Sequence, residues 1–191
     1  MNPEPDHTAM FAEAAEAPHV VSRLLAANHH TVAQLAADLR TNPPTAVLTC
    51  ARGSSDHAAT YLRYLIETRL GVLTSSAAPS VASIYGGSPA AAGMLCTAIS
   101  QSGASPDLVA TMQAAKEAGA ATLAMVNVEG SPLALLADTM LPLHAGRERS
   151  VAATKSYIAA LAVSAQLVAA WGEDKALAAG LASLPEQLER A

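Results

Sequence analysis

Short, continuous apolar runs recur along this chain and are separated by segments with helical spacing. Such runs are typical of strands buried on both faces, because a half-exposed strand alternates apolar and polar residues. Strands of this kind that alternate with helices form a parallel sheet covered on both sides. We therefore expect an α/β, doubly wound, flavodoxin-like domain with a five-stranded parallel sheet. The expected strands span 46–51, 72–77, 94–99, 121–127 and 138–143.

Helical patterns fill most of the remaining chain. Two N-terminal helices are predicted over 10–17 and 18–39, and the Asn-Pro-Pro sequence at 42–44 ends the second. The later predicted helices span 56–70, 106–118, 151–170 and 177–190, and 78–93 is predicted as an irregular connection. The pattern divides the chain into a flexible tail over 1–8, N-terminal helices over 9–41, the α/β domain over 42–172 and a C-terminal helix or linker over 173–191.

Composition excludes several classes of function. The 191 residues are 51% hydrophobic and 14% charged, which suits one globular domain with a sizeable core. Because 16 acidic residues outnumber 11 basic ones and only one Trp and one Phe are present, a nucleic-acid partner is disfavoured. No apolar stretch approaches the roughly 20 residues of a membrane span, and the N-terminus lacks the pattern of a signal peptide. We expect a cytoplasmic protein without a membrane partner.

The two cysteines, Cys50 and Cys96, both fall in apolar strand-like runs. Buried free thiols are therefore favoured over a disulfide or a metal pair. We expect neither a metal nor another cofactor.

Two polar loops follow predicted strands at the point where a ligand would bind. Residues 100–103 are Ser-Gln-Ser-Gly and follow the third strand, and residues 52–55 are Arg-Gly-Ser-Ser and follow the first. Ligands bind at the carboxyl ends of parallel strands, where the free N–H groups of the next helix also point. Hydroxyls, a carboxamide and helix N-termini suit phosphate oxygens without a metal. These loops contain neither a P-loop nor a dinucleotide fingerprint.

A third loop, over 144–155, leaves the fifth strand and is the most charged stretch of the chain. Each of the three loops has a simpler explanation, because Ser and Thr before helices are commonly plain caps. For Glu148 and Lys155, a solvated face or an ion pair is the alternative to a role at the site. The three loops together favour a binding site.

The ordered set of loops resembles the sugar isomerase (SIS) domain family. More closely, it is similar to the first of the two SIS domains in the isomerase half of glucosamine-6-phosphate synthase and in related agaS-type and glucosamine-6-phosphate deaminase proteins. The similar segments are the opening helix over 10–18, the loops at 50–55 and 100–103, and the stretch Ala-Gly-Arg-Glu-Arg-Ser-Val-Ala-Ala-Thr-Lys-Ser at 145–156.

The resemblance implies a set of sugar-phosphate contacts, in which Val151 and Ala153 face the sugar. This sequence departs from the family pattern at Arg52, where a synthase-type relative has cysteine, at Ala104 and Pro106, and at Ala153, which replaces a serine. The implied substrate-binding residues are Gly53, Ser54, Ser55, Ser100, Gln101, Ser102, Ser105, Val151 and Ala153.

The resemblance also implies a reaction, namely aldose–ketose isomerisation of an amino-sugar phosphate coupled to loss of the amine. Family enzymes of this type carry a second SIS domain that holds the general base, so we expect this chain to be half of such an enzyme and its reading frame to continue beyond Ala191. Glu148 is the only carboxylate in a signature loop and is a candidate polar orienter or acid/base. Without a glutaminase domain in this sequence, a deaminase or isomerase is favoured over a synthase.

Two other functions remain open. The chain could be a non-catalytic domain that senses a phosphorylated sugar, although no basic helix-turn-helix segment is evident. It could also be a single-domain isomerase that a second copy completes, with the apolar helices over 18–39 and 151–170 as the dimer face. Catalysis by the isolated chain would separate these alternatives.

Overall fold

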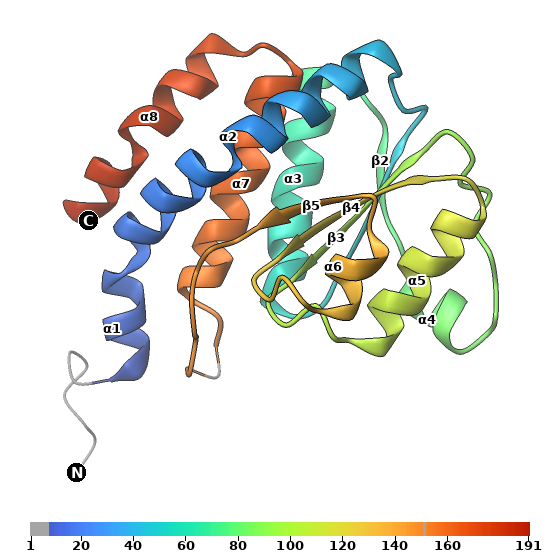
Figure 1. Ribbon diagram of the computed structural model, residues 1–191, viewed down its shortest axis with the longest axis horizontal. Helices are drawn as coiled ribbons and strands as arrows, with labels where there is room; N and C mark the ends of the chain where they lie inside the picture. Colours follow the sequence, from blue (N-terminus) through green and yellow to red (C-terminus); the bar gives the residue numbers. More distant parts are fainter. Residues whose placement is uncertain (1–7, 151) are drawn as a thin grey trace.

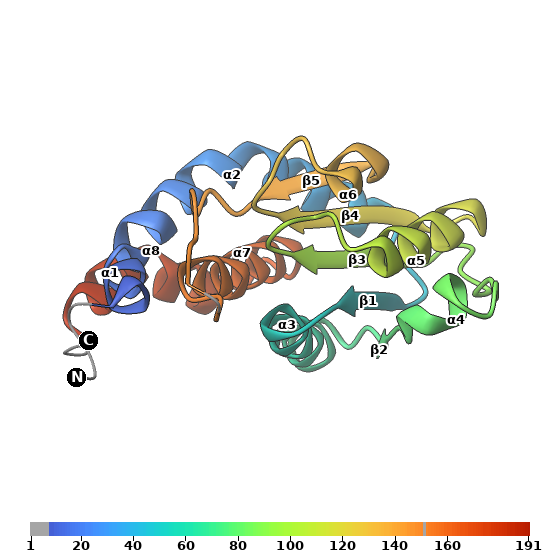
Figure 2. The ribbon, with the colours of Figure 1, turned by 90° about the horizontal axis from the view of Figure 1, so that it is seen from below.

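A computed structural model describes residues 8–150 and 152–191, so most of the predicted tail and Val151 lie outside the described residues. The described residues form an all-parallel five-stranded sheet with the order β2-β1-β3-β4-β5. Figure 2 shows the arrowheads of the strands pointing the same way, toward the side where α1 lies. The flavodoxin-like α/β prediction is confirmed. The strands are β1 (Val47–Ala51), β2 (Thr74–Ser76), β3 (Leu95–Ser100), β4 (Ala121–Val126) and β5 (Thr139–Pro142).

Helices connect the strands and flank them at both ends of the chain (Figure 1). Two short helices, α4 and α6, were not expected, and each begins with a proline that is suited to a first helical turn. The predicted helix over 151–170 begins four residues late, and the segment over 173–191 is helical over most of its length. The helices are α1 (Ala9–Ala15), α2 (Ala17–Thr41), α3 (Ser54–Leu70), α4 (Pro79–Ser83), α5 (Pro106–Glu117), α6 (Pro132–Leu136), α7 (Lys155–Trp171) and α8 (Lys175–Glu189).

The sheet is buried on both faces, as the continuous apolar runs require. Along β3, Leu95 and Ile99 pack with α2, α3 and α7, whereas Cys96 and Ala98 pack with α5 and α6. In Figure 1, α2, α3, α7 and α8 lie on one side of the strands, and α4, α5 and α6 lie on the other. Both cysteines are buried and free, which confirms the expectation for them.

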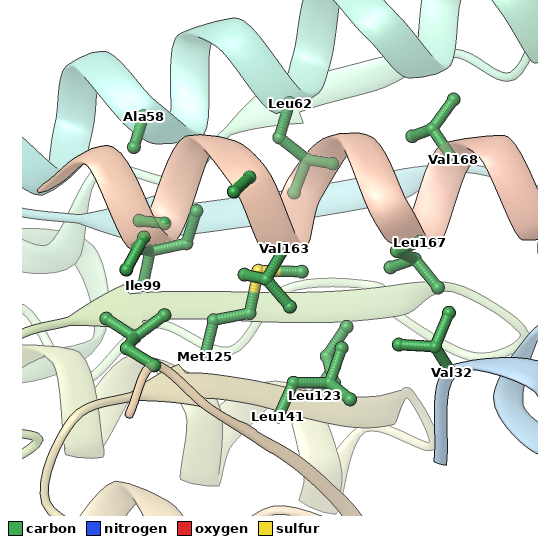
Figure 3. Packing of buried hydrophobic residues seen from close by; sticks show 14 of the residues in the cluster. Val32, Ala58, Leu62, Ile99, Leu123, Met125, Leu141, Val163, Leu167 and Val168 are labelled. Atoms are coloured by element: carbon green, nitrogen blue, oxygen red, sulfur yellow. The ribbon is translucent and has the colours of Figure 1, made fainter. Parts of the chain in front are cut away.

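The larger core lies between the sheet and the helices α2, α3 and α7. Figure 3 shows Leu62 of α3 and Val163 and Leu167 of α7 directed into the same space as Met125 and Leu123 of β4. Fully burying a side chain of this size contributes about 2 kcal/mol. Helices α2 and α7 also pack closely on each other. Their apolar faces, which the sequence suggested as a dimer face, are therefore used within the domain.

Helix α8 packs against α2 and α7 and buries Leu181. Within residues 8–150 and 152–191, no helix combines the length and the apolar character that a membrane crossing needs.

Candidate functional site

The two polar loops expected to bind a ligand lie side by side at the carboxyl ends of β1 and β3, which are neighbours in the sheet. From β1 the chain continues through α3 on one face, and from β3 it continues through α5 on the other. The connections therefore diverge between these strands, which is where open parallel sheets bind ligands.

The loop after β3 folds into a tight turn through its own hydroxyls. The Gly103 N–H donates to Ser100 Oγ over 3.0 Å, and the Ala104 N–H donates to Ser102 Oγ over 3.3 Å. Gly103 has φ +62°, and a Cβ there would lie 2.0 Å from Ser131 Oγ. A side chain at position 103 is excluded both by the left-handed backbone and by Ser131, so this turn requires glycine.

Helices α3 and α5 both begin at this site, with Gly53 and Ser105 as their N-cap residues. Among the described residues, the side chains of Ser54, Ser55, Gln101 and Ser105 form no hydrogen bond. The simpler explanation, in which these hydroxyls are caps, is therefore not what the structure shows for Ser54, Ser55 and Ser105. First-turn N–H groups and unbonded polar side chains converge here, and both suit an anion.

A cavity of about 370 Å³ opens between these loops and the segment that leads into α7. It brings together eight of the nine predicted binding residues and also Glu148, while Val151 lies outside the described residues. Three lining residues were not among the predicted contacts, namely Arg52, Leu108 and Ser150. The predicted residues that line the cavity are Gly53, Ser54, Ser55, Ser100, Gln101, Ser102, Ser105 and Ala153.

The Glu148 carboxylate lies at the start of α7 and accepts hydrogen bonds from its first residues. The donors are the Thr154 N–H over 2.7 Å, the Ser156 N–H over 3.3 Å and the Ser156 hydroxyl. A carboxylate at this position satisfies free N–H groups and complements the positive end of the helix dipole. This contact also explains why α7 begins at Lys155, several residues after the predicted start.

Arg52 brings a positive charge to the edge of the cavity. Its guanidinium forms an ion pair with Asp107, which lies in the first turn of α5. The Arg52 side chain remains 60% exposed, so it can also reach a ligand. Across the described residues, no cluster of three His, Cys, Asp or Glu side chains could hold a metal ion. Besides the Glu148 carboxylate, the cavity lining offers hydrogen-bond donors and one arginine, which is a set suited to a phosphate.

Comparison with known proteins identifies the family of this fold and site. A family model described as the SIS domain matches residues 43–170. The isomerizing glutamine–fructose-6-phosphate aminotransferase of Symbiobacterium thermophilum is 35% identical over 164 residues, which are 80% of this chain and 26% of the relative. The chain spans about a quarter of the length of this curated relative.

Among solved structures, a candidate phosphosugar isomerase from Silicibacter pomeroyi DSS-3 superposes with a TM-score of 0.93 and is 45% identical. The match covers 96% of this chain and 56% of that one. The C-terminal domain of glucosamine-fructose-6-phosphate aminotransferase from Francisella tularensis has a TM-score of 0.74 at 22% identity, covering 98% of this chain and 55% of that one. At that identity the likeness shows the fold alone.

Proposed function

This chain belongs to the SIS domain family, and on that premise we propose that its cavity binds the phosphate and sugar of a phosphorylated hexose or hexosamine. The observation that carries the proposal is the convergence of two helix N-termini and four unbonded polar side chains in one cavity. The phosphate would lie between the starts of α3 and α5. The sugar would extend toward Ala153.

We further propose that the chain is the N-terminal half of a two-SIS enzyme, an amino-sugar phosphate isomerase or deaminase of the glucosamine 6-phosphate to fructose 6-phosphate type. In that reaction a base removes the proton from C2 and a proton is returned to C1. Water then hydrolyses the resulting C2 imine to the ketone and ammonia. The similarity to an isomerizing aminotransferase and to a candidate phosphosugar isomerase supports this class of reaction.

The base would come from outside this cavity. Glu148 is the only carboxylate among the residues that line it, and its oxygens accept hydrogen bonds from Thr154 and Ser156. That engagement favours an orienting role for Glu148 over proton transfer. A second SIS domain, or a second copy of the chain, would supply the base, and binding energy at the phosphate would orient C1 and C2 toward it.

Because the base would come from outside this cavity, one alternative function is also considered. If the base is absent from the natural protein, the cavity would bind a sugar phosphate without changing it, and the chain would act as a sensor. Incubation with glucosamine 6-phosphate, followed by assays for ammonia and fructose 6-phosphate, separates the two functions. Release of both products supports the enzyme, whereas binding without either product in the full-length protein supports the sensor.

Calorimetric titration tests the binding proposal. We expect saturable binding of fructose 6-phosphate or glucosamine 6-phosphate, and none of unphosphorylated fructose at the same concentrations. Ser102→Ala should weaken binding by about 1 to 3 kcal/mol, which is the usual loss for a hydrogen bond to a charged group. Ser183→Ala, on α8, is the matched control and should bind as the unmodified protein does. Equal binding of fructose and fructose 6-phosphate would contradict the proposal.

A further inference from the structure

A buried carboxylate on the first helix contacts the loop over 144–155, which contributes Ser150 to the cavity lining. Glu13 of α1 is only 6% exposed. Its Oε1 accepts the Arg149 N–H over 2.5 Å, and its Oε2 accepts the Ser150 N–H over 3.1 Å and the Ser150 hydroxyl. Residues 136 or 137 positions apart in the sequence are thus joined, and one of them, Ser150, lines the cavity.

Helix α1 buries little apolar surface. Among the described residues, Glu13 is the one buried member of α1, whereas Met10 and Phe11 are about half exposed. Burying a carboxylate is costly unless its oxygens are hydrogen-bonded, so a helix that docks through one must form those bonds. The hydrogen bonds from Arg149 and Ser150 therefore attach α1 to this loop.

A second carboxylate holds the other end of the same loop. Glu16, which follows α1, forms an ion pair with Lys155 Nζ at 2.7 Å, and the Lys155 side chain is only 4% exposed. Lys155 is the first residue of α7 and lies two positions after Ala153, which lines the cavity. Glu13 thus holds the loop at the cavity-lining residue Ser150, and Glu16 holds it two positions after Ala153, which also lines the cavity.

We infer that Glu13 is a positioning residue for the sugar-phosphate cavity, and that α1 is part of the binding machinery although it does not line the cavity. The identity of the ligand rests on the proposed function, whereas the contact between Glu13 and the loop does not. Hydrogen bonds from Ser150 and Arg149 lower the pKa of the Glu13 carboxyl, so the carboxylate stays ionised and the contact persists at neutral pH.

Glu13→Gln tests the inference, because it keeps the size of the side chain and removes the charge. In the ligand-free protein, we expect hydrogen exchange of the Arg149 and Ser150 amides to accelerate about tenfold, since hydrogen bonds to charged groups are the stronger ones. The dissociation constant for fructose 6-phosphate should rise about tenfold. Glu117→Gln, at the far end of α5, is the matched control and should change neither quantity.

A double-mutant cycle separates positioning from general destabilisation. Glu13→Gln and Ser150→Ala act through one contact, so their effects on the dissociation constant should be less than additive. If Glu13→Gln does not fold, Glu16→Gln weakens the same loop at a half-exposed position and should accelerate exchange near Lys155.

Two negative results have different meanings. Unchanged exchange at Arg149 and Ser150 in folded Glu13→Gln, together with an unchanged dissociation constant, would overturn the inference. If the unmodified protein bound no sugar phosphate, the proposed function would fail, whereas faster exchange in Glu13→Gln would still support the role of Glu13 in holding the loop.

Discussion

Arg52 and Asp107 form an ion pair at the edge of the cavity, joining the loop after β1 to the first turn of α5. The pair connects the two helix starts between which we place the phosphate. It also leaves a carboxylate close to an anion site, where Arg52 offsets its negative charge. The affinity of the cavity for anions therefore depends on how Asp107 and the ligand share one guanidinium.

Asp107→Asn should tighten the binding of fructose 6-phosphate by about threefold to tenfold, because it removes a negative charge and releases Arg52 toward the ligand. Arg52→Ala should weaken binding. In the double variant, Asp107→Asn should tighten binding much less, because Arg52 is no longer there to be released. Calorimetric titration at low ionic strength measures the dissociation constant of the unmodified protein, the two single variants and the double variant. Weaker binding by Asp107→Asn would contradict this account of the pair.

Gly103→Ala should lower the free energy of unfolding by about 3 kcal/mol, since it combines strain at positive φ with a clash against Ser131. Gly53 has φ +57° but open space around it, so Gly53→Ala should cost about 1 to 2 kcal/mol from strain alone. Gly130→Ala meets neither problem and should change stability by less than about 0.5 kcal/mol. Urea denaturation measures the free energy of unfolding of each variant. Equal losses in all three variants would contradict the explanation from strain and steric clash.

Thr97→Val should raise the free energy of unfolding by about 1 kcal/mol. The Thr97 hydroxyl on β3 is buried and finds no hydrogen-bond partner in the described part of the chain, so replacing it with a methyl group removes an unsatisfied polar atom. Thr122→Val is the contrasting variant. The Thr122 hydroxyl forms hydrogen bonds with Asp138, so its loss should lower the free energy of unfolding. The midpoint of thermal or urea unfolding should therefore rise in Thr97→Val and fall in Thr122→Val, although the chemical change is the same.

The contribution of Glu13 to stability should depend on pH. Its folded-state pKa lies below the ordinary value of 4.5, chiefly because the Ser150 hydroxyl and the Arg149 N–H donate to the carboxylate. The folded state therefore binds fewer protons than the unfolded chain, so the stabilisation is present above pH 4.5 and is lost as pH falls through the folded pKa.

The stability difference between the unmodified protein and Glu13→Gln should accordingly be constant near neutral pH and shrink below pH 4.5. Asp138, whose pKa is also lowered, is present in both proteins and cancels in the comparison. Urea unfolding at a series of pH values measures the difference. A stability difference between the two proteins that grew on acidification would contradict this prediction.

The sheet could be predicted because its strands are continuous apolar runs. The apolar side chains of β3 face a helical layer on each side, and the polar turn after it marks the carboxyl end of the strand. Those local patterns were enough to find the strands, the longer helices and the polar loops around the cavity, whereas the individual lining residues, such as Ala153, were predicted from the resemblance to the SIS family.

Contacts between distant segments could not be predicted from local pattern. Helix α4 and helix α6 are only five residues long and show too little periodicity to detect. The start of α7 depends on the Glu148 carboxylate, and the order of the loop depends on Glu13, more than 130 positions away. Ser150 lies in the third predicted loop, but no local pattern singles it out within that loop as a cavity residue, because its position depends on that long-range contact.

A crystal structure of this protein with fructose 6-phosphate would test the central claim most directly. The account predicts phosphate density between the starts of α3 and α5, with its oxygens within hydrogen-bond distance of Ser54, Ser102 and Ser105. The sugar should extend toward Ala153. Phosphate bound elsewhere, with this cavity empty at a saturating concentration, would contradict the account.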